Sequence, residues 1–368
     1  MTNKLDNTQQ NLLFSFLANY AAMHASEGST HVQDMIKTVL RNNEDYLIGH
    51  KWEIVWGPSF FSVTGPEQKT ADNTMFVLYD STHQQYLIAI AGSLTAFDWI
   101  IEDLMVVTTS RWSYGQPPQN ANVADGTLVG LERLKELTAP SSQSTGEQTL
   151  AEFLSAQVAQ SGGPIDVTVT GHSLGGALSL AAALWLRDTM SESDATVSVS
   201  AFANPTIGND VLVNYLEQRL PNHQRVWNTM DIVPHVWSTD LIDQIPNLYT
   251  KSDEIPDAYV FALGLAYSIN HIVKDEHYEH TSSQVDKLVG RFNHNIVNPN
   301  EWFYENYYHQ VYYQHIKAYM ELLHIPHLLT DEQADYQHFI QSMWQEKEAI
   351  YREKVQVLVN EGESLEKS

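Results

Sequence analysis

The sequence predicts an α/β fold in which helices flank a central, mostly parallel β-sheet. In the middle of the chain, short runs of β-branched and aromatic residues alternate with segments of helical periodicity. In addition, the apolar run Ile165–Thr170 leads through a glycine-rich turn directly into a helix of small residues. Strands and helices that alternate in this way are typical of parallel sheets covered by helices.

The predicted elements follow one another along most of the chain. Strands are expected at Trp52–Trp56, Met75–Tyr79, Tyr86–Ala91, Leu104–Thr108, Ile165–Thr170, Val197–Ala201 and Arg225–Asn228. Helices are expected at Leu12–His24, His31–Leu40, Leu128–Leu137, Glu147–Ala159, Gly175–Asp188, Asn209–Leu220 and Trp302–Leu323. Because several early strands follow one another closely, we expect antiparallel pairs at one side of the sheet.

The remaining stretches define the expected domain organisation. Gly115–Gly126 and Ala139–Gly146 are polar and turn-rich, which indicates surface loops, and residues 237–298 have an irregular pattern. We expect residues 1–330 to form one domain that includes this irregular segment, and residues 331–368 to form a helical extension packed on it. The apolar residues at helical spacing in the extension are Phe339, Met343, Trp344, Ile350, Val355 and Leu358.

The composition excludes several classes of function. Of the 368 residues 43% are hydrophobic, which is enough to bury a core. The chain has 20 Lys+Arg against 45 Asp+Glu, and the resulting charge of −25 repels phosphate backbones and anionic membrane surfaces. We therefore expect no nucleic-acid partner and a neutral or cationic substrate. The absence of cysteine excludes disulfides, thiolate metal ligands and a cysteine nucleophile.

Neither a signal peptide nor a membrane span is predicted. The apolar stretch Asn11–Met23 is interrupted by Ser15, Asn19 and Tyr20, so an amphipathic helix is favoured over a Sec signal. The longest other apolar run, Ala258–Ile269, is shorter than the roughly 18–20 residues that a span requires. We expect a soluble protein, either cytoplasmic or exported by a route without a Sec signal peptide.

A candidate nucleophile lies in the turn after Ile165–Thr170. Gly171-His172-Ser173-Leu174-Gly175 is a G-x-S-x-G motif between a strand and a helix, which is the context of a nucleophile elbow. A Cβ atom at Gly171 or Gly175 would collide with the neighbouring strand or helix. Ser173 would lie at a helix N-terminus, where backbone N–H groups favour developing negative charge. The alternative is a glycine-rich connection that contains an incidental serine.

A candidate acid follows a later strand. Asp231 lies in the loop after Arg225–Asn228, 58 residues beyond Ser173. Taken alone, an aspartate before Ile-Val-Pro is a turn residue. Together with the elbow, a carboxylate at this position is expected to orient an imidazole base and to stabilise its protonated form.

Three motifs in this order resemble the class 3 lipases. They are Gly171–Ala177 (G-H-S-L-G-G-A), Phe202–Asn209 (F-A-N-P-T-I-G-N) and Asn228–Pro234 (N-x-x-D-I-V-P). This family comprises α/β-hydrolases typified by fungal triacylglycerol lipases. The resemblance runs roughly from Met75 to Val236, and it implies an α/β-hydrolase fold with a triad in the order Ser…Asp…His. One departure is Val129, where the family often has histidine.

An oxyanion hole is also implied by the resemblance. One donor is the backbone N–H of Leu174, the residue after the nucleophile. The second is assigned to Ser93, because the segment after Tyr86–Ala91 is similar to the family's strand–Gly-Ser/Thr loop. The family's usual arginine before that glycine is Ala91 here. An ordinary strand-ending turn is the alternative for Gly92-Ser93.

Two apolar segments are candidates for a lid. In related lipases a lid helix follows the second oxyanion donor, and an apolar set occupies this place: Leu94, Phe97, Trp99, Ile100 and Ile101. Our hypothesis is that this segment or Ala258–Ile269 opens at a lipid–water interface. A buried core helix is an equal alternative for either segment.

The third triad member is the hardest to assign, because the chain contains sixteen histidines. The family order places this residue after Asp231. His315, in Q-H-I-K-A-Y-M-E-L-L, looks more like bacterial class 3 sequences and is our prediction. His309, in H-Q-V-Y, is the close alternative. The remaining candidates are His271, His277, His280 and His294.

Two other groups of histidines have no predicted role in catalysis. His277 and His280, with Asp275 and Glu276, could form a metal site, but without further ligands at zinc spacing a solvated face is favoured. His172 fits the G-H-S pattern of the family and receives no catalytic role.

These features predict a serine carboxylic-ester hydrolase that acts on acylglycerols through an acyl-enzyme. The predicted catalytic residues are Ser173, Asp231 and His315, with Leu174 and Ser93 as oxyanion donors. No metal and no organic cofactor is expected, and the expected partner is a neutral lipid or ester. The oligomeric state is left open. The alternatives are a phospholipase or thioesterase with the same triad, and a lipase-like binding protein without catalysis.

Overall fold

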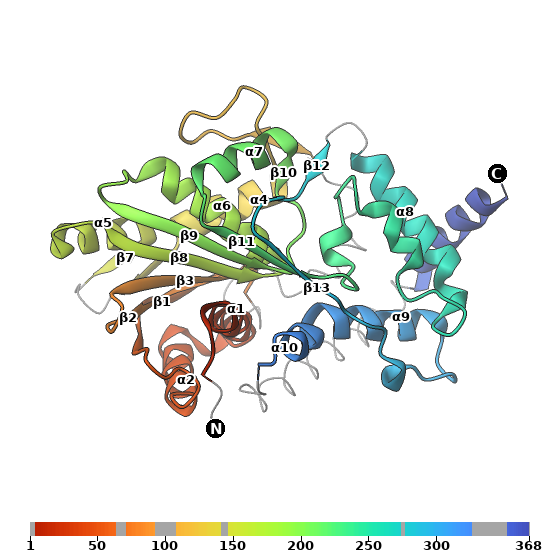
Figure 1. The fold of residues 1–368 in the computed structure, drawn as a ribbon, viewed down its shortest axis with the longest axis horizontal. Helices are drawn as coiled ribbons and strands as arrows, with labels where there is room; N and C mark the ends of the chain where they lie inside the picture. Colours follow the sequence, from red (N-terminus) through yellow and green to blue (C-terminus); the bar gives the residue numbers. More distant parts are fainter. Residues whose placement is uncertain are drawn as a thin grey trace.

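A seven-stranded sheet forms the centre of the computed structural model, which describes residues 4–63, 71–92, 108–140, 146–273, 277–325 and 352–367 (Figure 1). The strand order is β1-β2-β3-β8-β9-β11-β13. These strands are β1 (Trp52–Phe61), β2 (Asn73–Asp80), β3 (Gln85–Ala91), β8 (Ile165–His172), β9 (Ala195–Phe202), β11 (His223–Asn228) and β13 (Val285–Leu288).

Short strands form two smaller sheets, one with the order β12-β10-β5-β4 and one of β6 and β7. They are β4 (Thr109–Arg111), β5 (Asn122–Ala124), β6 (Thr138–Pro140), β7 (Glu147–Thr149), β10 (Gly208–Asn209) and β12 (Tyr278–Glu279). The two segments predicted as loops therefore contain β5 and part of β6. The predicted strand Leu104–Thr108 lies outside the described residues except for Thr108, and β4 begins at the next residue.

The central sheet has the mixed pairing that the sequence predicts. β1, β2 and β3 pair antiparallel, and every pair from β3 through β8, β9 and β11 to β13 is parallel. The tight hairpin Ser81–Gln84 joins β2 to β3, whereas the parallel strands β8 and β9 are joined by a helix, as parallel neighbours require. The predicted α/β fold class is confirmed.

Helices cover both faces of this sheet (Figure 1). They are α1 (Asn7–Met23), α2 (Ser29–Asn42), α4 (Asp125–Glu136), α5 (Leu150–Ser161), α6 (Leu174–Thr189), α7 (Asp210–Arg219), α8 (Tyr259–Val273), α9 (Phe303–Tyr312) and α10 (Ala318–Leu322). Successive strand residues point to opposite faces: Ile88 and Ile90 join the core beneath α6, and Leu87 and Ala89 join the core beneath α1. The apolar runs of β2 and β3 thus supply two cores at once.

The central helix α6 lies close against the sheet because its inner face is made of small residues. Ala177, Ala181, Ala182 and Ala183 are all buried there. The close approach places the first turn of α6 directly at the end of β8.

Residues 237–298 are more regular than the sequence predicts. They contain α8, three short 3₁₀-helices and the parallel strand β13, which extends the central sheet beside β11. A buried core helix is one of the two sequence interpretations of Ala258–Ile269, but no helical period marks it, because Tyr259–Ile269 is apolar on nearly all sides. The strand was missed because Val-Asp-Lys-Leu is short and polar, as an edge strand can be.

The C-terminal helix, residues 352–366, packs on α8. Val355 and Leu358 are buried in the same core as Phe261. At Gly264 and Gly362 a Cβ atom would overlap a backbone carbonyl of the opposite helix. The other four predicted core residues of the extension lie outside the described residues. We propose that the extension docks through this contact. None of the helices in the described ranges is both long and apolar enough to cross a bilayer.

Candidate active site

The site begins at the sharp turn between β8 and α6. Ser173 has φ 60° and ψ −130°, a backbone conformation that is strained for a residue with a Cβ atom. Its neighbours must be glycines: a Cβ at Gly171 would overlap the backbone of Gly175, and a Cβ at Gly175 would overlap the carbonyl of Ile90. The steric argument for a nucleophile elbow therefore matches the observed backbone.

Three side chains from distant parts of the chain form one hydrogen-bonded line at this turn. His315 Nε2 lies 2.8 Å from Ser173 Oγ. On the other side of the ring, His315 Nδ1 lies 2.9 and 3.0 Å from the two carboxylate oxygens of Asp231. Because a carboxylate only accepts, Nδ1 carries the proton, and Nε2 is left to accept the hydrogen bond of the Ser173 hydroxyl. An imidazole in this tautomer can take the serine proton.

Asp231 is fully buried and held from two further directions. The backbone N–H of Val233 donates to Oδ1 at 3.1 Å, and the Tyr319 hydroxyl donates to Oδ2 at 2.8 Å. Burial, followed by the charge of Asp231, raises the pKa of Tyr319 well above its usual value, so this hydroxyl remains a donor. The carboxylate is thereby fixed toward the ring of His315.

The helical turn that carries His315 is attached to the loop that carries Asp231. His315 lies in a π-helical turn, Tyr313–Lys317, between α9 and α10. The Asn228 side-chain amide donates to the backbone carbonyl of Gln314 at 3.0 Å and to its side-chain oxygen at 2.9 Å. Asn228 thus ties the end of β11 to the residue before His315. Sequence analysis quoted Asn228 only as part of a motif.

His172 supports His315 from the opposite side. Its Nε2 lies 2.8 Å from the backbone carbonyl of His315, and the two rings are 4.6 Å apart. Burial, and then the neighbouring His315, lowers the pKa of His172 well below its usual value. The ring is therefore neutral and donates from Nε2. Sequence analysis gave this residue no catalytic role, and here it contacts the backbone of the candidate base.

Of the two predicted oxyanion donors, Leu174 alone lies within the described residues. Leu174 is the first residue of α6, where backbone N–H groups have no acceptor within the helix. Ser93 lies outside the described residues. The residue before it, Gly92, comes so close to Leu174 that an added Cβ would lie 2.6 Å from Leu174 Cγ. This contact brings the end of β3 next to the elbow.

The other candidate histidines lie elsewhere. The His309 side chain is 47% exposed, and its Nδ1 is 3.6 Å from a carboxylate oxygen of Glu301, so it is not the ring that meets Ser173.

His277 is exposed, but the ring of His280 is 2.7 Å from the Pro234 carbonyl, and burial lowers the pKa of His280 well below the usual value. The expected solvated face is therefore wrong for His280. Asp275 and Glu276 lie outside the described residues.

Sequence analysis also missed a group of possible metal ligands, His50, Asp80 and His83, whose donor atoms lie within 4.8 Å of one another. No spacing rule connects these three residues, since they come from a loop, a strand end and a hairpin. Only the folded sheet brings them together.

The chain has the α/β-hydrolase fold, with a sharp strand–turn–helix elbow at Ser173. Residues 87–241 match the family Lipase (class 3), which confirms the predicted resemblance over this part of the chain. A crystal structure described as M37 lipase is 27% identical, superposes with a TM-score of 0.73, and covers 86% of this chain and 92% of its own.

Curated relatives are matched over part of their length. A secreted mono- and diacylglycerol lipase of Fusarium solani is 26% identical over 44% of this chain and 42% of its own. A lipase of Rhizopus niveus is 28% identical over 51% of this chain and 45% of its own. A chloroplastic phospholipase A(1) of Arabidopsis thaliana is 29% identical over 41% of this chain and 33% of its own. The chain thus spans less than half the length of these three relatives.

His235, in the loop that carries Asp231, makes the free energy of unfolding depend on pH in the acidic range. His235 Nδ1 lies 2.7 Å from the Asp231 carbonyl, and burial lowers the pKa of His235 to about 4. The bond to Asp231 and its charge oppose this shift, and Arg225 and Lys287 add to it. As the pH falls below about 6.5, the unfolded chain binds a proton that the folded chain does not. We therefore expect the free energy of unfolding to fall between about pH 6.5 and about pH 4.

The variant His235→Asn isolates this contribution, because its amide retains an N–H donor but does not titrate. Urea unfolding at pH 7 and at pH 4.5 should show that the variant loses less stability on acidification than the wild type, by about 2.4 kcal/mol. Equal losses in the two proteins would contradict a neutral buried imidazole at position 235.

Proposed function

We propose that the chain hydrolyses carboxylic esters of lipids, acylglycerols in particular, through a Ser173–His315–Asp231 triad. The observation that carries this proposal is the continuous line from Ser173 Oγ through both ring nitrogens of His315 to the buried carboxylate of Asp231. A serine at a strained elbow, within 2.8 Å of an oriented imidazole, is the arrangement that acyl transfer requires.

The reaction follows from the positions of these groups. His315 Nε2 takes the Ser173 proton while Oγ attacks the ester carbonyl, and Asp231 stabilises the imidazolium. The N–H of Leu174, with Ser93 as the second donor, holds the oxyanion, where each donor contributes about 10²–10³ in turnover. The C–O bond to the alcohol then breaks, and the imidazolium gives the alcohol its proton. Water attacks the acyl-enzyme in the same way and releases the fatty acid.

Two observations favour acylglycerols as the substrate class: the net charge of the chain and its similarity to proteins named as lipases. A chain with a net charge of −25 repels anionic lipid surfaces, which favours neutral acylglycerols. The similar proteins from Fusarium solani and Rhizopus niveus are named as lipases. The likeness to a phospholipase A(1) keeps phospholipid ester hydrolysis as the second candidate, because the elbow does not determine the leaving group. A thioesterase with the same triad is the third.

Of the two candidate lid segments, segment 94–101 lies outside the described residues. In α8, Phe261, Leu265 and Ile269 are buried in a core shared with helix 352–366 and α9, and Tyr267 is 49% exposed. This packing supports the alternative that α8 is a core helix.

Replacing Ser173 or His315 by alanine should abolish hydrolysis of p-nitrophenyl esters and of emulsified triacylglycerols. We expect kcat to fall about 10⁴- to 10⁶-fold in either variant, because the nucleophile and its base act as a unit. A fluorophosphonate probe should label the wild type and fail to label Ser173→Ala.

The matched control is His309→Ala, which removes an exposed histidine from the same helical region. Its activity should stay within a factor of about two of the wild type, since surface substitutions of this kind have small effects. A wild type that neither hydrolyses esters nor reacts with the probe would favour a binding protein without catalysis.

Tyr319 is a positioning residue in this proposal. Tyr319→Phe removes one donor from Asp231 and leaves the Asn228 backbone N–H, which donates to the same hydroxyl at 3.0 Å, without its acceptor. We expect kcat/KM to fall about tenfold, in line with a lost hydrogen bond to a charged group. The acidic limb of the pH–rate profile should move to higher pH, because a carboxylate with fewer donors stabilises the imidazolium more strongly.

Tyr313→Phe is the control for this measurement. Tyr313 lies in the π-helical turn that carries His315, and its hydroxyl donates to Glu321 instead of to the triad. Both the rate and the pH profile should be unchanged in this variant. An unshifted profile in Tyr319→Phe would indicate that the tyrosine has a purely structural role.

A further inference from the structure

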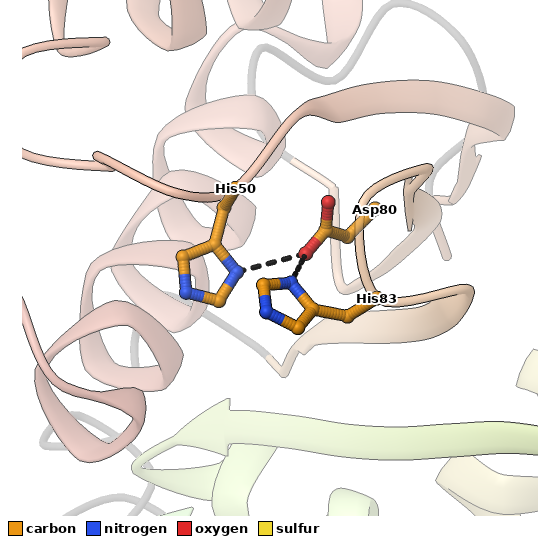
Figure 2. Close-up of side chains that lie close together, drawn as sticks. All are labelled: His50, Asp80 and His83. Atoms are coloured by element: carbon orange, nitrogen blue, oxygen red, sulfur yellow. Dashed lines mark hydrogen bonds and ion pairs between the residues drawn. The ribbon is translucent and has the colours of Figure 1, made fainter.

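A second cluster of titratable side chains consists of His50, Asp80 and His83 (Figure 2). The strand pairing puts it at the end of the central sheet opposite to Ser173. His50 Nδ1 is 2.8 Å and His83 Nδ1 is 2.6 Å from the same oxygen, Oδ2, of Asp80. Two imidazole nitrogens therefore meet at one carboxylate oxygen. The three residues come from the loop before β1, the end of β2 and the β2–β3 hairpin.

Asp80 is held so that one of its oxygens faces the two rings. Its side chain is fully buried, and Oδ1 accepts the backbone N–H groups of Lys51 at 2.8 Å and Thr82 at 3.0 Å. Burial opposes ionisation, but these N–H groups and the two histidines outweigh it and lower the pKa of Asp80 to about 2. The carboxylate is thus ionised and oriented, with Oδ2 directed at the two histidine rings.

The two histidines differ in their freedom to move. The His50 side chain is 9% exposed, and its ring stacks on Trp52 with 7° between the planes. The His83 side chain is 50% exposed on the hairpin. One ligand is therefore fixed by packing, and the other can adjust its position and leave a path from solvent.

We propose that His50, Asp80 and His83 bind one divalent transition-metal ion, with Zn²⁺ the best match. Two imidazoles and one carboxylate form a ligand set that zinc uses when a fourth position is left to water.

In the metal-free state the Nδ1 protons form hydrogen bonds to Oδ2. The nitrogens are therefore closer to this oxygen than two ligands of a tetrahedral zinc ion are to each other, which is about 3.3 Å. Moving these protons to Nε2 frees both lone pairs, and a small displacement of His83 opens the space. The charge of −25 raises the local cation concentration.

This site is separate from the proposed triad. Asp80 pairs with Gln85, and Gln85 pairs with Asp166 near the start of β8, whereas Ser173 follows the end of β8. At about 3.3 Å per residue, this length of strand separates the metal site from the nucleophile by roughly 23 Å. The ion would therefore act on stability, by linking the segment between α2 and β1 to the β2–β3 hairpin.

Zinc binding to the whole chain, first dialysed against EDTA, tests the proposal by isothermal titration calorimetry. We expect one ion per chain and a rise in Tm with added ZnCl₂. His83→Ala should weaken binding at least about tenfold and abolish the rise in Tm. Cobalt(II) should give the visible d–d spectrum of a four-coordinate site in the wild type, and this spectrum should disappear in His83→Ala.

His309→Ala is the matched control, because its histidine is similarly exposed, at 47%, and also lies near a carboxylate. It should bind zinc as the wild type does. His50→Ala is the second test variant, and circular dichroism shows whether either variant remains folded. A wild type that binds no zinc, or a folded His83→Ala that binds it equally well, would overturn the proposal and leave a hydrogen-bonded cluster.

The outcome is independent of the proposed esterase activity. Ser173→Ala should bind zinc normally, and metal-free His83→Ala should hydrolyse esters at the wild-type rate. Failure of one proposal therefore leaves the other standing.

Discussion

The hydrogen bond between His315 and Ser173 is the constraint on which the arrangement of the second half of the chain depends. It joins residues 142 positions apart, and its length of 2.8 Å tolerates little movement of either element. The serine is fixed by the β8–α6 turn, where glycines permit a close approach of strand and helix. The helical region from α9 to α10 must therefore dock at the carboxyl end of the parallel strands.

Two polar groups beside this bond, Asp231 and Tyr319, are fully buried, and each is held by more than one partner. Asp231 receives donors from Val233 and Tyr319 in addition to His315, which offsets the cost of burying a carboxylate. The loop behind it is supported by the segment between β11 and α9, since the Tyr249 hydroxyl donates to the Met230 carbonyl. Residues 237–298, whose sequence pattern is irregular, thus help to hold the proposed acid in place.

Sequence patterns predicted the parts of this site that depend on local structure. The elbow could be recognised because a strand, a glycine-rich turn and a small-residue helix follow one another directly, and Asp231 because it follows a strand of the same sheet. His172 and Tyr319 could not be assigned, because their roles arise from contacts across the fold. The same reason explains why His50, Asp80 and His83 went unnoticed.

The central claim is that Ser173 forms a covalent acyl-enzyme with His315 as its base. A crystal structure of the protein after reaction with an alkyl phosphonate ester tests it most directly, because this reagent traps a stable analogue of the tetrahedral intermediate. We predict a bond from Ser173 Oγ to phosphorus, a phosphoryl oxygen within about 3 Å of the Leu174 N–H, and His315 Nε2 beside the ester oxygen. Phosphorus bound elsewhere, or a phosphoryl oxygen directed away from the start of α6, would contradict the account.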